Sequence, residues 1–239
     1  MPAKSTQRKT TASKAARPVV KKAAARKPAP ARKLKGASEP EAAVPVVKNL
    51  TINPGRKAKV VSSELRYEVP LFRIYREQVK EQGRMLSRDI IRHNGSVVIL
   101  ALDRTKSKKD PWIVVERQYR HAANQFLWEL PAGKLDPGED PLAGAQRELE
   151  EETGYRAKKW KPLVEYFASP GFLGESMKVF LAEGLIPGDA HPEEDEAIEL
   201  RLVKLSDALK MIEQGAILDG KTLTSVLLYT RMLAKKRKK

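Results

Sequence analysis

The stretch GKLDPGEDPLAGAQRELEEETGY, residues 133–155, decides the fold of this 239-residue chain. Asp140 directly before Pro141 predicts the start of a helix, because an aspartate side chain caps free backbone N–H groups and proline fits the first helical position. Gly154 predicts its end, since glycine readily adopts the left-handed conformation that terminates helices. We therefore predict a helix over residues 141–153.

Three glutamates, Glu148, Glu151 and Glu152, stand at positions i, i+3 and i+4 of this helix and share one face. Carboxylates at this spacing repel one another, and Arg147 can reach Glu151 without neutralising all three charges. A divalent cation would relieve the repulsion, and an oxygen-only ligand set suits Mg²⁺ or Mn²⁺. In isolation the same face would be typical of a solvated acidic helix, so the surrounding residues decide between the two interpretations.

The spacing of those surrounding residues resembles the Nudix box, Gx5Ex7REUxEExGU, in which U is a bulky aliphatic residue. Only Tyr155, at the final U position, departs from the pattern, and that position serves packing. The resemblance implies an α+β protein with the Nudix α/β/α sandwich, in which helices cover a mixed central sheet. Every fixed position of the box is matched, by Gly133, Glu139, Arg147, Glu148, Glu151, Glu152 and Gly154.

The resemblance also implies which residues hold a metal ion. Glu148 and Glu152 would be the principal ligands of Mg²⁺ or Mn²⁺, and Glu151 would assist directly or through a water molecule. The backbone carbonyl of Ala132, directly before the box, would join them. These groups would place the cation beside a diphosphate.

Two further pairs of box residues are implied to be structural. Glu139 and Arg147 would hold the loop of the box against the helix. Gly133 and Gly138 would allow tight backbone turns, because glycine tolerates conformations that other residues avoid. Neither pair is expected to take part in the chemistry.

Features outside the box resemble the ADP-ribose pyrophosphatase subfamily, over about residues 60–230. Pro170 lies sixteen residues after Gly154, the offset that marks this subfamily. Residues 118–120 read QYR at the end of a predicted strand, and residues 129–133 read ELPAG at the entry to the box. Residues 193–196, which read EEDE, resemble the acidic loop that supplies a catalytic base.

The subfamily resemblance implies Mg²⁺-dependent hydrolysis of the diphosphate bond in ADP-ribose or a related ADP-sugar, with AMP and ribose 5-phosphate as products. Arg120 would bind phosphate, Glu194 would be the catalytic base, and Glu196 would be an auxiliary ligand or the alternative base. Gly171 and Glu175 would lie near the terminal ribose. Two alternatives stay open: a different substrate such as GDP-mannose, and a Nudix-fold protein that acts mainly through nucleic-acid binding by its tails.

The net charge of +16 lies in the two ends of the chain. Residues 1–48 carry 13 basic and only 2 acidic residues, residues 235–239 are all basic, and residues 49–234 have no net charge. The first segment is rich in Ala, Lys and Pro and predicts a disordered arm. Such an arm can contact nucleic acid loosely, can simply keep the protein soluble, or can be an organelle transit peptide.

Alternating apolar and polar positions over residues 59–79 and 84–92 predict half-buried strands. The sequence His-Asn-Gly at 93–95 predicts a hairpin turn into the apolar strand 97–102. We predict further strands over 112–116, 126–130, 161–168, 177–184 and 197–204, and helices over 206–214, capped by Ser206, and 222–234.

These elements divide the chain into four segments. In the enzymes that the chain resembles, the region before the central sheet pairs with a partner subunit, so we expect a homodimer. The segments are a basic tail over 1–48, an N-terminal sheet region over 49–95, the Nudix hydrolase domain over 96–234 and a basic tail over 235–239.

Composition excludes several other classes of protein. The chain has no cysteine, which rules out disulfides, thiolate metal sites and thiol nucleophiles, and its three histidines are isolated in the sequence. No apolar run is long enough to span a membrane, and the first residues lack the apolar core of a secretory signal. We therefore expect a cytoplasmic protein that has no contact with membranes.

Overall fold

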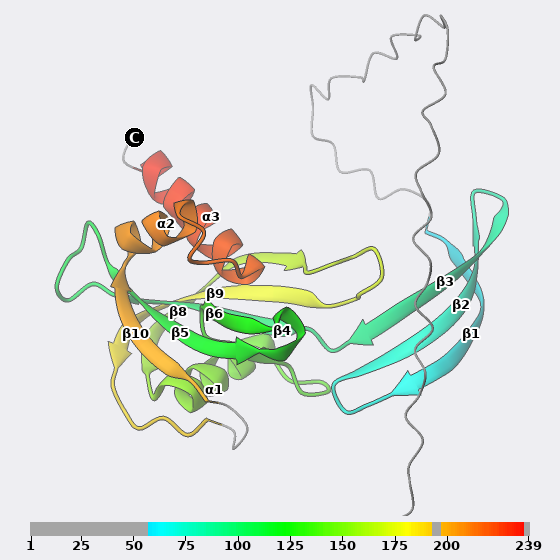
Figure 1. Cartoon of the computed structure of the whole chain (residues 1–239), viewed down its shortest axis with the longest axis horizontal. Helices are drawn as coiled ribbons and strands as arrows, with labels where there is room; N and C mark the ends of the chain where they lie inside the picture. Colours follow the sequence, from blue (N-terminus) through cyan, green and yellow to red (C-terminus); the bar gives the residue numbers. More distant parts are fainter. Residues whose placement is uncertain (1–56, 193–196, 237–239) are drawn as a thin grey trace, which may run out of the picture. The chain divides into compact units, whose positions relative to one another are not determined.

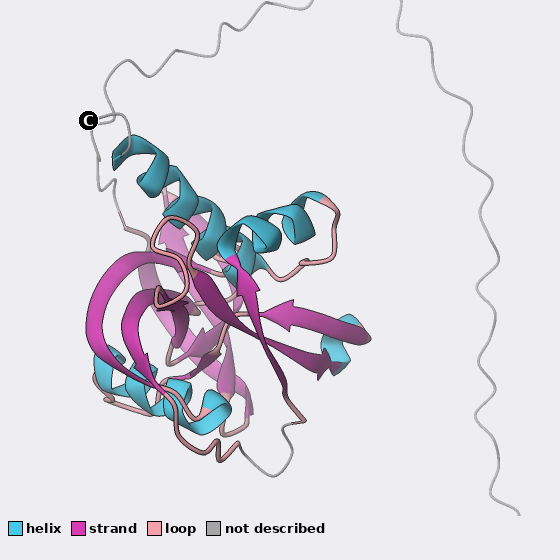
Figure 2. Ribbon diagram, turned by 90° about the vertical axis from the view of Figure 1, so that its left-hand side faces the viewer, coloured by secondary structure: helices cyan, strands magenta, loops and turns pink. Residues whose placement is uncertain are grey.

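The computed structural model describes residues 57–192 and 197–236, which fold as strands, α-helices and a 3₁₀ helix in an α+β arrangement (Figures 1 and 2). The N-terminal tail over 1–48 and most of the C-terminal tail lie outside these residues. The strands are β1 (Lys59–Glu68), β2 (Phe72–Glu81), β3 (Arg84–His93), β4 (Ser96–Asp103), β5 (Trp112–Arg120), β6 (Gln125–Glu129), β7 (Ala132–Lys134), β8 (Arg156–Phe167), β9 (Ser176–Ile186) and β10 (Glu199–Lys204). The helices are the 3₁₀ turn η1 (His121–Ala123), α1 (Pro141–Thr153), α2 (Leu205–Glu213) and α3 (Gly220–Lys236).

The larger sheet has seven strands in the order β10-β5-β4-β9-β8, with β6 paired to β5 and β7 to β4. Strand β4 runs parallel to β9 and antiparallel to β5 and β7, so the sheet is mixed as predicted. Such a sheet needs cover on both faces, and β4 is apolar at almost every position for that reason.

Alternate residues of β4 supply the two hydrophobic cores. Val97 and Ile99 belong to a core that includes Leu149 of α1, whereas Val98 and Leu100 belong to a core that includes residues of α2 and α3. Successive side chains of a strand point to opposite faces, so α1 covers one face of the sheet and α2 with α3 the other (Figure 2). This α/β/α arrangement confirms the predicted fold class.

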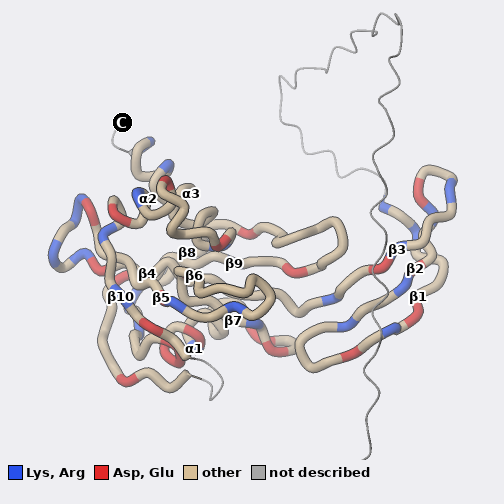
Figure 3. The backbone as a smooth tube through the Cα atoms, in the orientation of Figure 1, with Lys and Arg blue, Asp and Glu red and all other residues tan. Residues whose placement is uncertain are grey.

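Strands β1, β2 and β3 form a separate antiparallel sheet in that order (Figure 1). It joins the rest of the chain through backbone hydrogen bonds of Ile91, whose N–H donates to Phe172 and whose carbonyl accepts from Gly174. Basic and acidic residues both lie along these strands (Figure 3), and Arg76 forms a bidentate pair with Asp89 across β2 and β3.

The predicted hairpin at residues 93–95 is wrong. Strand β3 pairs with β2 and strand β4 pairs with β9, so the two strands flanking these residues belong to different sheets. Gly95 has a φ of +97°, which redirects the chain from one sheet to the other. The short polar sequence is typical of a reversal of chain direction. Strand β4, however, buries its apolar side chains in the core by pairing with β9, and this burial stabilises the fold more than a local hairpin would.

Helix α1 has the predicted bounds and the predicted ends. The Asp140 carboxylate accepts from the backbone N–H groups of Leu142 and Ala143, and Gly154 closes the helix with a φ of +71°. Helix α2 instead begins one residue earlier than predicted, after Lys204. The hydroxyl of Ser206 donates to Asp110, so Ser206 ties α2 to the β4–β5 loop and does not cap it.

No helix among the described residues is long and apolar enough to span a lipid bilayer.

Candidate active site

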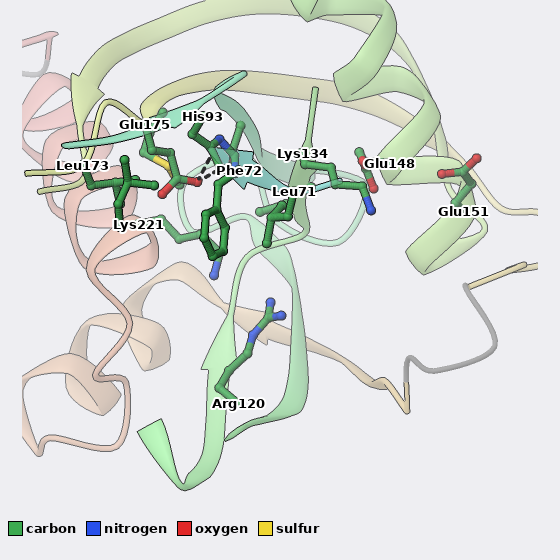
Figure 4. Close-up of a pocket in the computed structure, with 15 residues that line it drawn as sticks. Leu71, Phe72, His93, Arg120, Lys134, Glu148, Glu151, Leu173, Glu175 and Lys221 are labelled. Atoms are coloured by element: carbon green, nitrogen blue, oxygen red, sulfur yellow. Dashed lines mark hydrogen bonds and ion pairs between the residues drawn. The ribbon is translucent and has the colours of Figure 1, made fainter. Parts of the chain in front are cut away.

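A cleft of about 450 Å³ lies where the three-stranded sheet meets the larger sheet and α1 (Figure 4). Glu148 and Glu151 stand at one end, whereas Glu175 and Leu173 stand at the other (Figure 4). Of the residues predicted from sequence, the cleft brings together Arg120, Ala132, Gly133, Glu148, Glu151 and Glu175. Phe72, one of several aromatic residues that the sequence offers for stacking on a base, also lines it. The sequence did not indicate the other lining residues, among them Leu71, His93, Ser96, Lys134, Leu173 and Lys221.

The contact between Gly133 and Glu148 fixes one wall of the cleft. A Cβ atom on Gly133 would lie 1.9 Å from Cδ of Glu148, far inside van der Waals contact. The φ of Gly133 is not in the left-handed region, whereas that of Gly138 is +80°. Gly138 therefore serves a turn as expected, but Gly133 is required because a buried carboxylate packs directly against its backbone.

Glu152 lies one turn further along α1, behind the same wall. Its side chain is 3% exposed, and Oε2 accepts a hydrogen bond of 3.0 Å from the backbone N–H of Ala132. This bond holds β7 against α1. Two of the three glutamates on the predicted acidic face are therefore buried, and the face is not a solvated surface.

Arg147 is the centre of an ion-pair network on this wall. Its Nη1 lies 2.9 Å from Glu148 and 2.8 Å from Glu151, and its Nε donates to Glu139 at 3.0 Å. The hydrogen bonds with Glu139 are the largest cause that raises the pKa of Arg147. Conversely, the hydrogen bond from Arg147 and the backbone N–H of Asp136 lower the pKa of Glu139, so the loop of the box is fastened to the helix by a charged pair.

Arg120 reaches the cleft from the end of β5 and forms a bidentate pair with Glu129. Its Nε and Nη2 each donate to a carboxylate oxygen at 2.9 Å. The amino group of Lys221 bonds the same carboxylate. Burial raises the pKa of Glu129, but the hydrogen bond from Arg120 and the charge of Lys221 outweigh burial and lower it overall.

The other end of the cleft combines a polar cluster with apolar side chains. Ser96 donates to Oε1 of Glu175 at 2.6 Å, and Nδ1 of His93 lies 4.0 Å from the same oxygen. Pro170 does not line this cleft but a neighbouring apolar pocket that includes Phe172. Gly171 has open space where a side chain would stand, and Glu194 and Glu196 lie outside the described residues.

Comparison with known proteins addresses what this arrangement does. The domain family described as "NUDIX domain" matches residues 92–224, more than half of the chain. The chain belongs to the Nudix family. It is 39% identical over 167 residues to the "ADP-ribose pyrophosphatase" of Bacillus subtilis (strain 168), a match that covers 69% of this chain and 88% of that protein.

Other relatives of this Nudix hydrolase are described with the same substrate or with a different one. It is 36% identical to the "ADP-ribose pyrophosphatase" of Mycobacterium tuberculosis (strain ATCC 25618 / H37Rv), over 71% of this chain and 81% of that one. It is 34% identical to the "GDP-mannose pyrophosphatase" of Citrobacter koseri (strain ATCC BAA-895 / CDC 4225-83 / SGSC4696), over 56% and 76% of the two chains. A solved structure titled "Crystal structure of ADP compounds hydrolase" shares the fold, with a TM-score of 0.64, 18% identity and coverage of 76% of this chain and 96% of that one.

The residues on the helical wall fit a hard divalent cation in their chemistry. Glu148, Glu151, Glu152 and the carbonyl of Ala132 offer only oxygen atoms, and the Gly133 contact keeps Glu148 against the strand that carries Ala132. Over residues 57–192 and 197–236, no three acidic, histidine or cysteine side chains already gather as a metal-binding group. Nη1 of Arg147 contacts the carboxylates of both Glu148 and Glu151.

Proposed function

We propose that this Nudix hydrolase cleaves the diphosphate bond of ADP-ribose or a related ADP-sugar and releases AMP and ribose 5-phosphate. The observation that carries the proposal is the opposition of charges across one cleft, with Glu148 and Glu151 on one wall and Arg120 and Lys221 facing the same space. An anionic diphosphate needs cationic groups on its oxygens and an acidic face that can carry Mg²⁺. The names of the relatives with 39% and 36% identity support the choice of ADP-ribose.

We infer that Glu148, Glu152, Glu151 and the Ala132 carbonyl would hold Mg²⁺ or Mn²⁺. Such a cation neutralises the charge on the diphosphate oxygens and lowers the pKa of a bound water. Arg120 would bind a phosphate oxygen: Glu129 occupies its Nε and Nη2, which leaves Nη1 for the substrate. The role of the base that accepts a proton from water stays assigned to Glu194, with Glu196 as the alternative.

The far end of the cleft suits the sugar and base of the substrate. Ser96 occupies one oxygen of Glu175, so the other oxygen can accept from the hydroxyl groups of a ribose. Leu71, Phe72 and Leu173 add apolar surface to the same cleft. A nucleotide sugar carries both kinds of group beside its diphosphate, whereas an inorganic diphosphate carries neither.

We also propose that the active form is a homodimer that pairs through the three-stranded sheet. All ten residues of β1 are exposed, although Val60, Val61, Leu65 and Tyr67 are apolar. A strand that buries no residue contributes little to the stability of a single chain, and exposed apolar surface of this kind favours association. A partner would also cover the edge of β1, which pairs only with β2 among the strands of the described residues.

The proposal is tested with a panel of nucleoside diphosphate sugars, Mg²⁺ and the variant Glu152→Gln. Wild type should release AMP from ADP-ribose faster than GMP from GDP-mannose. Glu152→Gln should lower kcat/KM by about 100-fold or more, since a ligand charge is lost beside the diphosphate. The matched control is Glu150→Gln, which changes a half-exposed glutamate on another face of α1 and should keep the parent activity.

Two results would overturn the proposal. The first is a preference for GDP-mannose, which would mean that the chain acts on the substrate named for its less similar relatives. The second is parent activity in a folded Glu152→Gln protein, which would remove Glu152 from the metal site. Circular dichroism of both variants separates a local effect from loss of fold.

A further inference from the structure

The buried carboxylate of Glu129 holds two cations at once. It is the last residue of β6 and only 1% exposed. Arg120 binds it with two parallel hydrogen bonds, and Lys221 binds Oε2, the oxygen that also accepts from Nη2 of Arg120. Figure 4 shows the side chains of Lys221 and Arg120 among the residues that line the cleft, with their charged ends directed toward the same region.

The surroundings of Glu129 explain why two cations are needed. Its partner across the β5–β6 ladder is Glu116, which is also fully buried, so two carboxylates stand side by side on adjacent strands. Two ionised carboxylates in this position would repel each other. The hydrogen bonds with Glu129 are the largest cause that raises the pKa of Arg120, and the charges of Glu129, Glu116 and Glu152 raise it further. If Arg120 were the only cation beside these carboxylates, they would neutralise more of its charge. The guanidinium would then attract an anion in the cleft less strongly.

Lys221 is held in place by the start of α3. Its amino group lies 3.2 Å from Asp219, and Asp219 also accepts from the backbone N–H and the hydroxyl of Thr222. The same hydroxyl accepts from the backbone N–H of Leu130, the residue after Glu129. The first turn of α3 therefore docks on the segment that leads into the box. This contact places Lys221 beside Glu129, although the two residues are 92 positions apart in the sequence.

We propose that Lys221 is a positioning residue for the substrate phosphate: by sharing the Glu129 carboxylate, it leaves Arg120 oriented and electrostatically available to the anion in the cleft. This inference rests on the proposed function only for the identity of the anion. The bidentate pair sets the direction of the guanidinium, and Lys221 supplies the second positive charge that the paired buried carboxylates require. Lys221 itself is engaged by two carboxylates and acts through Arg120.

The first test is steady-state kinetics of Lys221→Met and Lys221→Arg with ADP-ribose. Lys221→Met should raise KM about tenfold while kcat changes less than about threefold, because phosphate binding weakens and the chemical step does not change. Lys221→Arg keeps the charge and should bring KM back to within about threefold of the parent. Lys210→Met removes the same charge from an exposed pair with Asp207 on α2 and should leave both parameters unchanged.

The second test needs no substrate and so separates this inference from the proposed function. The Nε–H resonance of Arg120, identified by its loss in Arg120→Lys, should be sharp in the parent because Nε donates to Glu129. It should broaden or shift in Lys221→Met and recover in Lys221→Arg. If Lys221→Met fails to fold, Lys221→Gln makes the same test, since its amide can donate to Glu129 without carrying charge.

The outcomes are distinct. A parent protein that hydrolyses none of the panel overturns the proposed function, whereas a perturbed Arg120 resonance still supports the positioning role. A folded Lys221→Met protein with an unchanged resonance and an unchanged KM overturns the inference. Failure of Lys221→Arg to restore KM also overturns it, since charge at this position would then not be what matters.

Discussion

The two sides of the cleft are stabilised in different ways. On the side of α1, Gly133 touches the Glu148 carboxylate and Arg147 links three glutamates, so the wall is closed by contacts within one chain. On the side of the three-stranded sheet, β1 is exposed along its whole length. The first wall depends on close contacts between a few atoms. The second is formed by residues of β2, β3 and the β1–β2 turn, and β1 itself lies exposed at the edge of their sheet. Substitutions on the two sides should therefore impair the protein for different reasons.

The largest effect is expected for Gly133→Ala. The new Cβ would overlap the Glu148 carboxylate, which has to move away from the strand that carries Ala132. Activity should fall about 100-fold or more, since a displacement of about 1 Å at reacting groups has effects of this size. Steady-state hydrolysis and urea unfolding of the purified variant measure the loss of activity and of stability separately.

Gly138→Ala provides the contrast within the same loop. Gly138 has a φ of +80° and no atom within 4 Å of the position of a Cβ. An alanine there should cost about 1 kcal/mol of stability through backbone strain, with activity retained within a few-fold. Equal losses of activity in the two variants would show that the loop conformation, and not the contact with Glu148, determines the wall.

These two glycines also show what sequence can predict. The ends of α1 follow from Asp140 and Gly154, because caps act within one turn of the helix. The role of Gly133 was misjudged, and the β3–β4 hairpin was wrong, because both depend on contacts between distant segments. Lys221 was missed for the same reason: no local pattern relates it to Glu129 on another element.

The next effect concerns the exposed edge strand of the three-stranded sheet and is expected for Val61→Asp. Val61 is 57% exposed on β1 and contributes little to the core of a single chain. If two copies pair through this sheet, a carboxylate at the interface should weaken the dimer at least about tenfold. Sedimentation at several concentrations measures the dissociation constant. Leu227→Asp, an exposed apolar position on α3, is the matched control and should leave assembly unchanged.

A parent protein that sediments as a monomer at all concentrations would remove the dimer proposal. Circular dichroism should show the same fold in Val61→Asp and the parent, because the side chain is exposed in the single chain. Loss of hydrolysis together with loss of the dimer would show that the second wall of the cleft needs its partner. Full activity of the monomer would show that one chain completes the site.

The smallest effect returns to the first wall and is expected for Glu139→Gln. Glu139 accepts from Arg147 and from the backbone N–H of Asp136, and these bonds lower its pKa below the ordinary value of 4.5. Glutamine keeps the shape but loses the charge, so the variant should be less stable by about 1 kcal/mol at pH 7. Urea unfolding of variant and parent over a range of pH measures the difference.

The pH dependence of that difference follows from the direction of the pKa shift. A carboxyl whose pKa is lower in the folded state stabilises the fold when it is ionised. The contribution of Glu139 is therefore complete above pH 4.5 and is lost as the pH falls through the lowered pKa of the folded protein. The gap between parent and Glu139→Gln should close over that acidic range, whereas Glu150→Gln, at a half-exposed ion pair, should follow the parent throughout. A gap that stays constant down to the lowest pH would mean that shape, and not charge, fastens the loop to α1.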